Sequence, residues 1–112
     1  MKDFQRITKF IVDFRNARNW KQFHNPKDLA VALSIEAAEL NELFLWKDKD
    51  QLESVNRERV SEELADILVY ALFLAEKYDF DIEEIIMSKM KKNALKYTVE
   101  KSKNLATKYT EL

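Results

Sequence analysis

Hydrophobic residues recur at intervals of three and four along most of the chain, which is the period of an amphipathic α-helix. The pattern predicts four helices, at about residues 2–18, 26–46, 57–77 and 81–97. The apolar face of the first helix consists of Phe4, Ile7, Phe10, Ile11 and Phe14. The sequence therefore predicts an all-α protein.

Two helix starts carry local signals. Asn25 precedes Pro26, which suits an N-cap followed by proline at the first helical position, and Asp28 lies near the positive end of that helix. Asp81 lies three residues before Glu84, as in a capping box. The second and fourth helices are therefore expected to begin at these positions.

The length of 112 residues is typical of a single domain. Residues 47–56 are polar and predict a linker with at most a short turn. Periodicity weakens after residue 98, so we expect one helical domain at 1–98 and a tail at 99–112 that folds only against something else.

The amino-acid composition excludes several classes of protein. Zero glycine argues against an all-β fold and a glycine-rich phosphate loop, and zero cysteine excludes disulfides and thiolate metal sites. A net charge of −1 makes a nucleic-acid polymer an unexpected partner. The charged start is unlike a signal peptide, and no apolar run approaches the roughly 18 residues of a membrane span. We therefore expect a cytoplasmic protein with no membrane partner.

Carboxylates occupy positions on two helices where leucine is expected. At about 100° per residue, Glu36 lies at the centre of an apolar stripe, and Glu39 lies about 60° to one side, next to Trp46. The stripe consists of Leu29, Leu33, Leu40 and Leu43. In the third helix Glu63 likewise lies at the centre of an apolar stripe. Asp66 lies about 60° from it, on the same side as Glu39 lies from Glu36, and is beside Phe73. That stripe consists of Val60, Ile67, Tyr70 and Leu74.

Antiparallel packing of these two helices would bring the four carboxylates together. Carboxylates removed from water without a counter-charge cost several kcal/mol each, so they must be protonated, paired with basic residues or bound to metal. Oxygen ligands without cysteine favour Mg²⁺ or Mn²⁺, and such an ion usually serves a phosphate-bearing substrate. The alternative is that Glu36 and Glu63 form ion pairs with Lys or Arg across a dimer.

Two further sets of side chains suit a nucleotide. Lys89, Asn93 and Lys96 recur on one face of the fourth helix, shared with Tyr97, where they could bind phosphates. The alternative is a lysine-rich, solvated helix. A second set could stack a nucleobase or form core: Trp20, Phe23, His24, Trp46 and Tyr70.

These residues match a known family. The segments IEAAELNELFLW and EELADILVY resemble the Glu-x-x-Glu and Glu-x-x-Asp signature of the all-α nucleoside triphosphate pyrophosphohydrolases, the MazG-like group. Further segments resemble the dCTP pyrophosphatase branch: WKQFHNPKDLAVAL, SKMKKNALKY and TKYTEL. The chain departs from the group at Ile35 and Ala38, where relatives often have glycine, and at Ala94 and Thr98, which replace an arginine and a proline. The departures leave the metal chemistry intact and bear on base preference.

The resemblance implies a four-helix MazG-like bundle whose active site is completed by oligomerisation, in a homodimer or dimer-based tetramer. It implies hydrolysis between the α and β phosphates of a nucleoside triphosphate, with dCTP or a modified pyrimidine as the expected substrate. The Mg²⁺ ligands, with Mn²⁺ as a substitute, would be Glu36, Glu39, Glu63 and Asp66. Residues near the triphosphate would be Lys89, Asn93, Lys96 and Tyr97. The base pocket would contain His24, Trp46 and Tyr70, with Trp20 and Phe23 supporting its wall.

Glu39 is our choice for orienting or deprotonating the attacking water, because it lies off the centre of the stripe.

The apolar residues Val31, Ile35, Leu45 and Leu72 suggest a subunit interface. A non-catalytic nucleotide- or protein-binding module of the same fold is the alternative function. A redox di-metal bundle is set aside, because it calls for Glu-x-x-His pairs and His24 lies in none.

Overall fold

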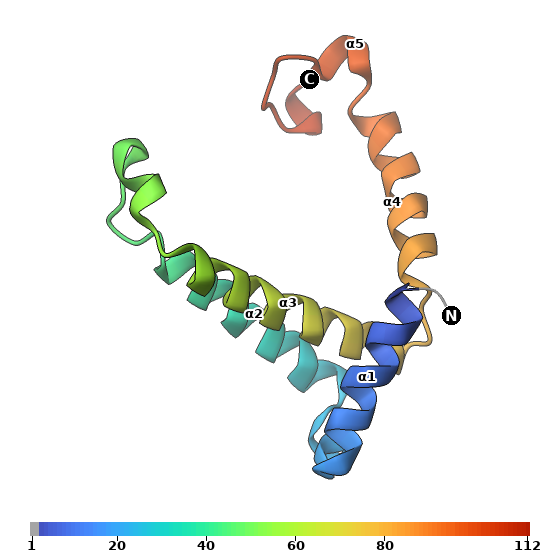
Figure 1. Cartoon of the computed structure of the whole chain (residues 1–112). Coiled ribbons are helices and arrows are strands. Elements are labelled where there is room, and N and C mark those ends of the chain that lie inside the picture. Colours follow the sequence, from blue (N-terminus) through green and yellow to red (C-terminus); the bar gives the residue numbers. More distant parts are fainter. Residues whose placement is uncertain (1–2) are drawn as a thin grey trace. The chain divides into compact units, whose positions relative to one another are not determined.

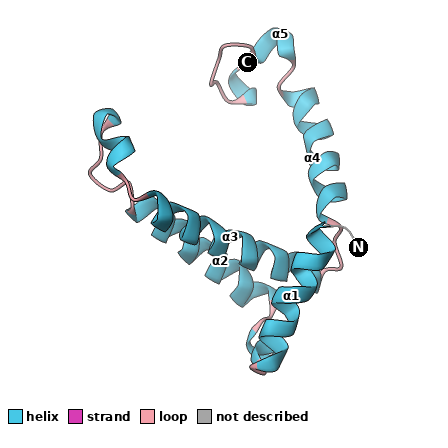
Figure 2. Ribbon diagram, viewed as in Figure 1, coloured by secondary structure: helices cyan, strands magenta, loops and turns pink. Residues whose placement is uncertain are grey.

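A computed structural model describes residues 3–112, and within that range every regular element is helical (Figure 2). The α-helices are α1 (Asp3–Ala17), α2 (Pro26–Glu42), α3 (Arg57–Lys77), α4 (Ile82–Lys96) and α5 (Val99–Ser102). The 3₁₀ helices are η1 (Trp20–Phe23), η2 (Lys49–Ser54) and η3 (Tyr109–Glu111). The predicted all-α class is confirmed.

The helix starts follow side-chain caps. The Asn25 side chain accepts a hydrogen bond from the Asp28 N–H at 2.9 Å, and the Asp81 carboxylate accepts one from the Glu84 N–H at 2.9 Å. Both N-caps were predicted and are confirmed. Asn56 caps α3 in the same way, accepting from the Arg59 N–H at 3.1 Å. Each side chain satisfies a backbone donor that the first turn of a helix leaves unpaired.

The predicted end of α2 near Trp46 is wrong, because the helix ends at Glu42. The Phe44 N–H bonds the Asn41 carbonyl and the Lys47 N–H bonds the Phe44 carbonyl, so tighter turns replace the helical pattern. Trp46 itself has a φ of 61°. A backbone that turns into the left-handed region cannot continue a right-handed helix.

In a chain without glycine, other residues take the left-handed positions that end helices. Asn19, Asp79 and Asn104 have φ values of 56°, 54° and 68° and follow α1, α3 and α5. Asn and Asp tolerate this region better than other non-glycine residues. Asn and Asp therefore occupy backbone positions with positive φ where glycine is usually found.

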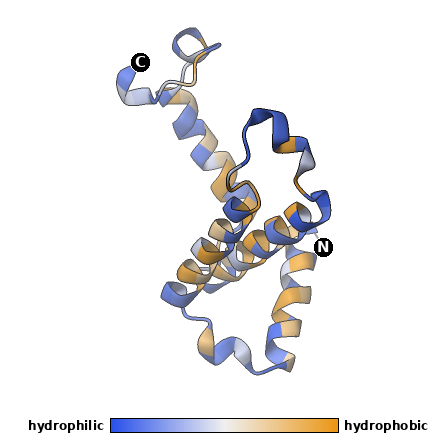
Figure 3. Ribbon diagram, turned by 90° about the vertical axis from the view of Figure 1, so that its left-hand side faces the viewer, coloured by the Kyte–Doolittle hydropathy of each residue, from blue (hydrophilic) through white to orange (hydrophobic). Residues whose placement is uncertain are grey.

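The chain divides into two compact units, Met1–Asp79 and Phe80–Leu112. In the first unit, α2 and α3 run antiparallel side by side, and α1 packs against α3 (Figure 1). Figure 3 shows hydrophobic residues along both helices of this hairpin and mainly hydrophilic ones in the connection that carries η2. The core residues of the described chain are Leu29, Leu72, Phe73 and Ala75.

Much apolar surface of the first unit stays exposed. Val31, Ile35 and Leu45, which were expected to form an interface, are 46%, 53% and 56% exposed. Leu72 was expected there too, and this was wrong, because it is buried in the core of its own chain. It lies on α3 next to Phe73 and one turn before Glu76, the two residues that Arg15 of α1 contacts.

The second unit comprises α4, α5 and η3. Residues 99–112 thus contain two short helical elements, and the predicted domain limit at residue 98 stays a prediction. None of the helices in residues 3–112 is long and apolar enough to cross a membrane.

Candidate metal centre and its surroundings

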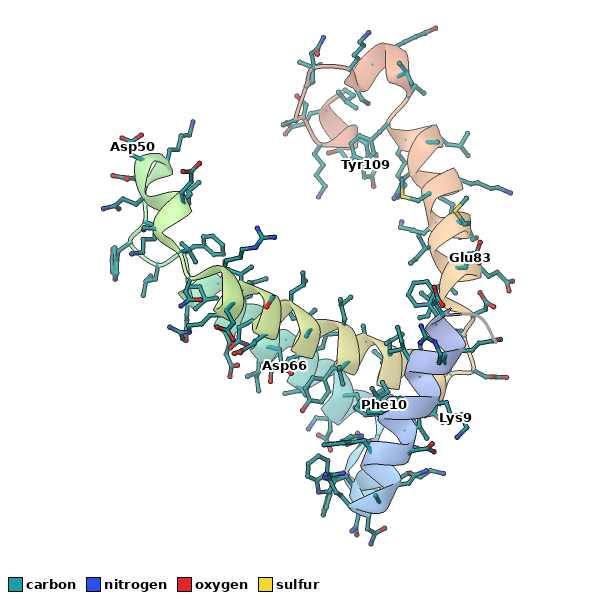
Figure 4. All side chains as sticks on the ribbon, viewed as in Figure 1. Lys9, Phe10, Asp50, Asp66, Glu83 and Tyr109 are labelled. Atoms are coloured by element: carbon teal, nitrogen blue, oxygen red, sulfur yellow. The ribbon has the colours of Figure 1, made fainter. Side chains whose placement is uncertain are left out.

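Three carboxylates come together in the half of the α2–α3 hairpin that is nearer its connection. Glu36 and Glu39 of α2 and Glu63 of α3 each place one oxygen within 4.8 Å of the others. Glu36 and Glu63 are half-buried and Glu39 is exposed, as their positions on the helical stripes predict. The fourth predicted ligand, Asp66, is exposed on α3 about one turn beyond Glu63 (Figure 4).

The cluster has no internal counter-charge. One oxygen of Glu36 and one of Glu63, the Oε2 atom in each case, are buried without a hydrogen-bond partner. The salt bridges within residues 3–112 involve neither these residues nor Glu39 and Asp66. Within the described part of one chain these carboxylates therefore have no cationic partner, and the alternative of an ion pair across a dimer stays a prediction.

The electrostatic consequence is a shift in protonation. Burial, followed by the hydrogen bond and charge of Glu39 and the charge of Asp66, raises the pKa of Glu36 to about 7. Burial and Glu39 likewise raise the pKa of Glu63. The surroundings thus disfavour the ionised form of both carboxyl groups. A bound cation would instead favour the ionised form and lower both pKa values.

The donor set fits a hard divalent cation. All candidate ligands are carboxylate oxygens, the type that Mg²⁺ and Mn²⁺ prefer, and two of them have buried atoms without a partner. The candidate ligand oxygens come from both helices and all lie within 4.8 Å of one another.

An aromatic group adjoins the cluster at Tyr70. Burial and the charges of Glu36, Asp66 and Glu39 raise the pKa of Tyr70. Its ring centroid lies 6.4 Å from that of Phe73, which lies 4.9 Å from that of His24. Phe73 therefore connects two of the predicted base-pocket residues, His24 and Tyr70. The sequence had predicted only that Phe73 lies beside Asp66.

The surroundings of His24 disfavour its charged form. Burial, then the positive charges of Arg15 and Lys77, lower its pKa, and its Nδ1 atom is buried without a partner. The ring can offer this nitrogen as a donor or as an acceptor, depending on the tautomer.

Sequence reasoning missed Arg15. Its side chain is 1% exposed, donates from Nη1 to Glu76 Oε2 at 3.1 Å, and lies 5.6 Å from the centroid of the Phe73 ring. The helical period places Arg15 close to the predicted apolar face of α1, and this was the only available signal. Its partner lies 61 residues away, so the pair could not be recognised from local pattern.

Three other predicted pocket residues lie elsewhere in the first unit. Trp20 packs edge-on against Phe14, with ring centroids 5.9 Å apart, and Phe23 is 62% exposed. Trp46 is 90% exposed and follows the C-terminal end of α2. His24 precedes that helix, and its length separates the two by about 24 Å. One chain does not bring Trp46 and His24 into one pocket.

The predicted phosphate contacts all belong to the second unit. Lys89, Asn93 and Lys96 lie on α4, with both lysines exposed and Asn93 half-buried, and Tyr97 caps the helix end. Lys96 and Tyr97 both contact the ring of Tyr109, which the sequence did not single out.

The sequence is similar to known proteins over most of its length. The model of the MazG-like family matches residues 31–112. The chain is 37% identical over 111 residues to dCTP pyrophosphatase 1 of Rattus norvegicus and 35% identical over 111 residues to that of Homo sapiens. Each match covers 95% of this chain and 65% of the relative, so the chain spans slightly less than two thirds of these relatives.

A solved structure is also similar. The crystal structure of a pyrophosphatase from Archaeoglobus fulgidus superposes with a TM-score of 0.83 at 37% identity. The match covers 88% of this chain and 94% of the other.

Proposed function

The chain belongs to the MazG-like family, and we propose on this basis that it is a Mg²⁺-dependent nucleoside triphosphate pyrophosphohydrolase. Water would attack the α-phosphorus, the bond to the bridging oxygen would break, and the products would be a nucleoside monophosphate and pyrophosphate. The observation that carries the proposal is the cluster of Glu36, Glu39 and Glu63, which has no counter-charge in the described chain.

The carboxylates divide into two roles. The half-buried Glu36 and Glu63 would hold the ion, with Glu39 and Asp66 completing its acidic surroundings. A bound Mg²⁺ would offset charge on the phosphate oxygens and lower the pKa of a coordinated water. Glu39 is our choice to orient or deprotonate the attacking water, because it is the exposed member of the cluster.

The proposed substrate is dCTP or a modified pyrimidine nucleotide. The relatives named dCTP pyrophosphatase 1 support this choice. The rings of His24, Phe73 and Tyr70 also support it, because they form a continuous aromatic group whose Tyr70 end feels the charges of the acidic cluster. We propose a role in cleansing the nucleotide pool of the cytoplasm, where such a substrate occurs.

The triphosphate would be bound by Lys89, Asn93, Lys96 and Tyr97. Two exposed lysines with no ion pair in residues 3–112 can supply positive charge that the acidic cluster lacks. Asn93 presents an amide whose hydrogen-bonding contact is a weak one of 3.8 Å to Met90 Sδ. A phosphate oxygen would be a stronger acceptor for this group.

We propose that the working form is a homodimer or a dimer-based tetramer. Val31, Ile35 and Leu45 expose apolar side chains that an interface would cover. Trp46 is separated from His24 by the length of α2, so it would join the base pocket only from a second copy of the chain. Size-exclusion chromatography with light scattering would detect the assembly.

The test of the proposed activity is a panel of canonical and modified nucleoside triphosphates, assayed with Mg²⁺ and with EDTA. We expect metal-dependent release of pyrophosphate and monophosphate, with the highest kcat/KM for a pyrimidine deoxynucleotide. Release of orthophosphate would place the cleaved bond elsewhere and contradict the mechanism. No release from a folded protein would favour the alternative, a non-catalytic binding module.

A further inference from the structure

The C-terminal segment of the second unit folds back onto the end of α4. The Nζ atom of Lys96 lies 4.7 Å from the centroid of the Tyr109 ring. The rings of Tyr97 and Tyr109 meet edge to face, with centroids 5.8 Å apart and an interplanar angle of 81°. Figure 4 shows Tyr109 within the returning segment. One aromatic ring thus contacts two neighbouring residues that the proposed function assigns to the triphosphate.

The backbone explains how one ring reaches both. Lys96 is the last residue of α4, and Tyr97 leaves the helical conformation with φ −118° and ψ 73°. Thr98 then caps α5, accepting from the Lys101 N–H at 3.4 Å. Asn104, at φ 68°, follows α5, and the chain returns to η3, which begins at Tyr109.

The contact holds a lysine without neutralising it. An ammonium over an aromatic face is attracted by the negative charge of the ring face, and the ring contributes no carboxylate that would compete with phosphate. The salt bridges within residues 3–112 do not include Lys96. An ammonium has three donors, so those not directed at the ring stay free to bind phosphate oxygens.

Fixing the side chain also lowers the entropic cost of binding. A lysine side chain loses much of its rotamer freedom when it is ordered. A ring that restricts the ammonium beforehand leaves less freedom to be lost when a triphosphate binds.

We propose that Tyr109 is a positioning residue for Lys96, so that the segment 99–112 acts as part of the triphosphate site. This inference rests on the proposed function, since Lys96 is given its role there. It adds a role in binding for residues 99–112, to none of which a role was assigned from the sequence.

The contact is tested first without any substrate. Proton–carbon NMR spectra of the full chain report the ε-methylene protons of Lys96, assigned by their loss in Lys96→Met. A ring over the ammonium shifts these protons upfield. We expect the shift to disappear in Tyr109→Leu and to persist in Tyr109→Phe and in Leu105→Ala, an exposed control on the same segment. An unshifted Lys96 signal in the unaltered chain would overturn the inference.

The functional test is a double-mutant cycle on kcat/KM with the best nucleotide of the panel. Tyr109→Leu is expected to lower kcat/KM about two- to fivefold, mainly through KM, because an exposed cation–π contact contributes about 0.5–1 kcal/mol. Tyr109→Phe keeps the ring and should therefore keep most of the kcat/KM of the unaltered chain. In the Lys96→Met background, Tyr109→Leu should have no further effect, which a merely structural role of the ring would not produce.

The outcomes separate the two proposals. If the unaltered chain releases no pyrophosphate, the proposed function fails, and the positioning role fails with it. If the chain is active but Tyr109→Leu matches the unaltered protein, or if the two changes multiply, only the positioning role is overturned. Binding of inorganic tripolyphosphate with Mg²⁺, measured by calorimetry, should weaken in Tyr109→Leu by the same two- to fivefold.

Discussion

Two charged groups on α3 differ in how they are compensated. Glu76 pairs with Arg15, whose side chain is 1% exposed, at 3.1 Å. Glu63, nearer the start of the same helix, lies with Glu36 and Glu39, and buried oxygens of Glu63 and Glu36 have no partner. Folding satisfies the first group within the chain and leaves the second unsatisfied. The paired charge is therefore best explained by stability and the unpaired cluster by binding, since unpaired buried charge costs free energy.

The largest predicted effect follows from removing charge from the cluster. Glu36→Gln or Glu63→Gln should lower kcat/KM at least a hundredfold with Mg²⁺, because each removes an ionised ligand. Without metal, either variant should unfold at a higher temperature than the unaltered chain, because repulsion among the carboxylates is reduced. Enzyme kinetics and thermal melts with EDTA measure the two effects.

Glu62→Gln is the matched control, since Glu62 is exposed, neighbours Glu63 and lies on another face of α3. It should change neither activity nor melting temperature. If Glu36→Gln and Glu63→Gln destabilised the metal-free protein, the cluster would be a structural ion-pair site and the comparison with Glu76 would fail.

The second prediction concerns the compensated pair. Glu76→Gln leaves the Arg15 guanidinium buried without its counter-charge, and the free energy of unfolding should fall by about 2–3 kcal/mol. Urea denaturation followed by circular dichroism measures this loss. The loss should be similar with and without Mg²⁺. A metal-dependent loss would instead connect the pair to the binding site.

The sequence predicts the acidic cluster better than the Arg15–Glu76 pair, because only the cluster is marked by a pattern of neighbouring residues. Helical periodicity correctly placed Glu36 and Glu63 at half-buried positions, and the α3 limits at Arg57 and Lys77 match the structure. Arg15 was missed because a charged residue is ordinarily expected to face solvent. Its burial depends on Glu76, 61 residues along the chain.

The same distinction applies at the chain's end. The N-cap at Asp81 was recognised, because a cap and the N–H it binds lie three residues apart. The contact between Tyr109 and Lys96 was not, because weak periodicity over residues 99–112 gave no sign that the chain turns back. Tertiary contacts between short irregular segments leave no repeating pattern in the sequence.

The third prediction is a pH dependence of the metal-free protein. The pKa of Glu36 is about 7 in the folded chain against 4.5 for the ordinary group. The folded state therefore binds this proton more tightly, and the associated stability is present below pH 4.5 and is lost as the pH rises through 7. With allowance for solvent screening, the loss between pH 4.5 and 8 should be about 1–2 kcal/mol.

The lowered pKa of His24 acts in the opposite direction, because its proton binds more tightly to the unfolded chain and acid destabilises the fold below about pH 6.5. The difference between the unaltered chain and Glu36→Gln across the pH series isolates the carboxyl. Saturating Mg²⁺ should remove that difference in slope. An identical pH dependence in both proteins would show that Glu36 ionises freely and needs no counter-charge.

The smallest predicted effect tests whether pairing or burial distinguishes the two regions. Lys9 and Asp13 on α1 form an ion pair at 2.8 Å, shorter than the 3.1 Å between Arg15 and Glu76, but their side chains are 64% and 62% exposed. Asp13→Asn should lower the free energy of unfolding by less than about 0.5 kcal/mol, because water solvates either charge when the other is absent. Urea denaturation in parallel with Glu76→Gln gives the comparison. A loss at Asp13 as large as that at Glu76, or larger, would mean that contact distance sets the energy. A much smaller loss at Asp13 would mean that desolvation does, and desolvation is what makes the unpaired carboxylates of the cluster costly.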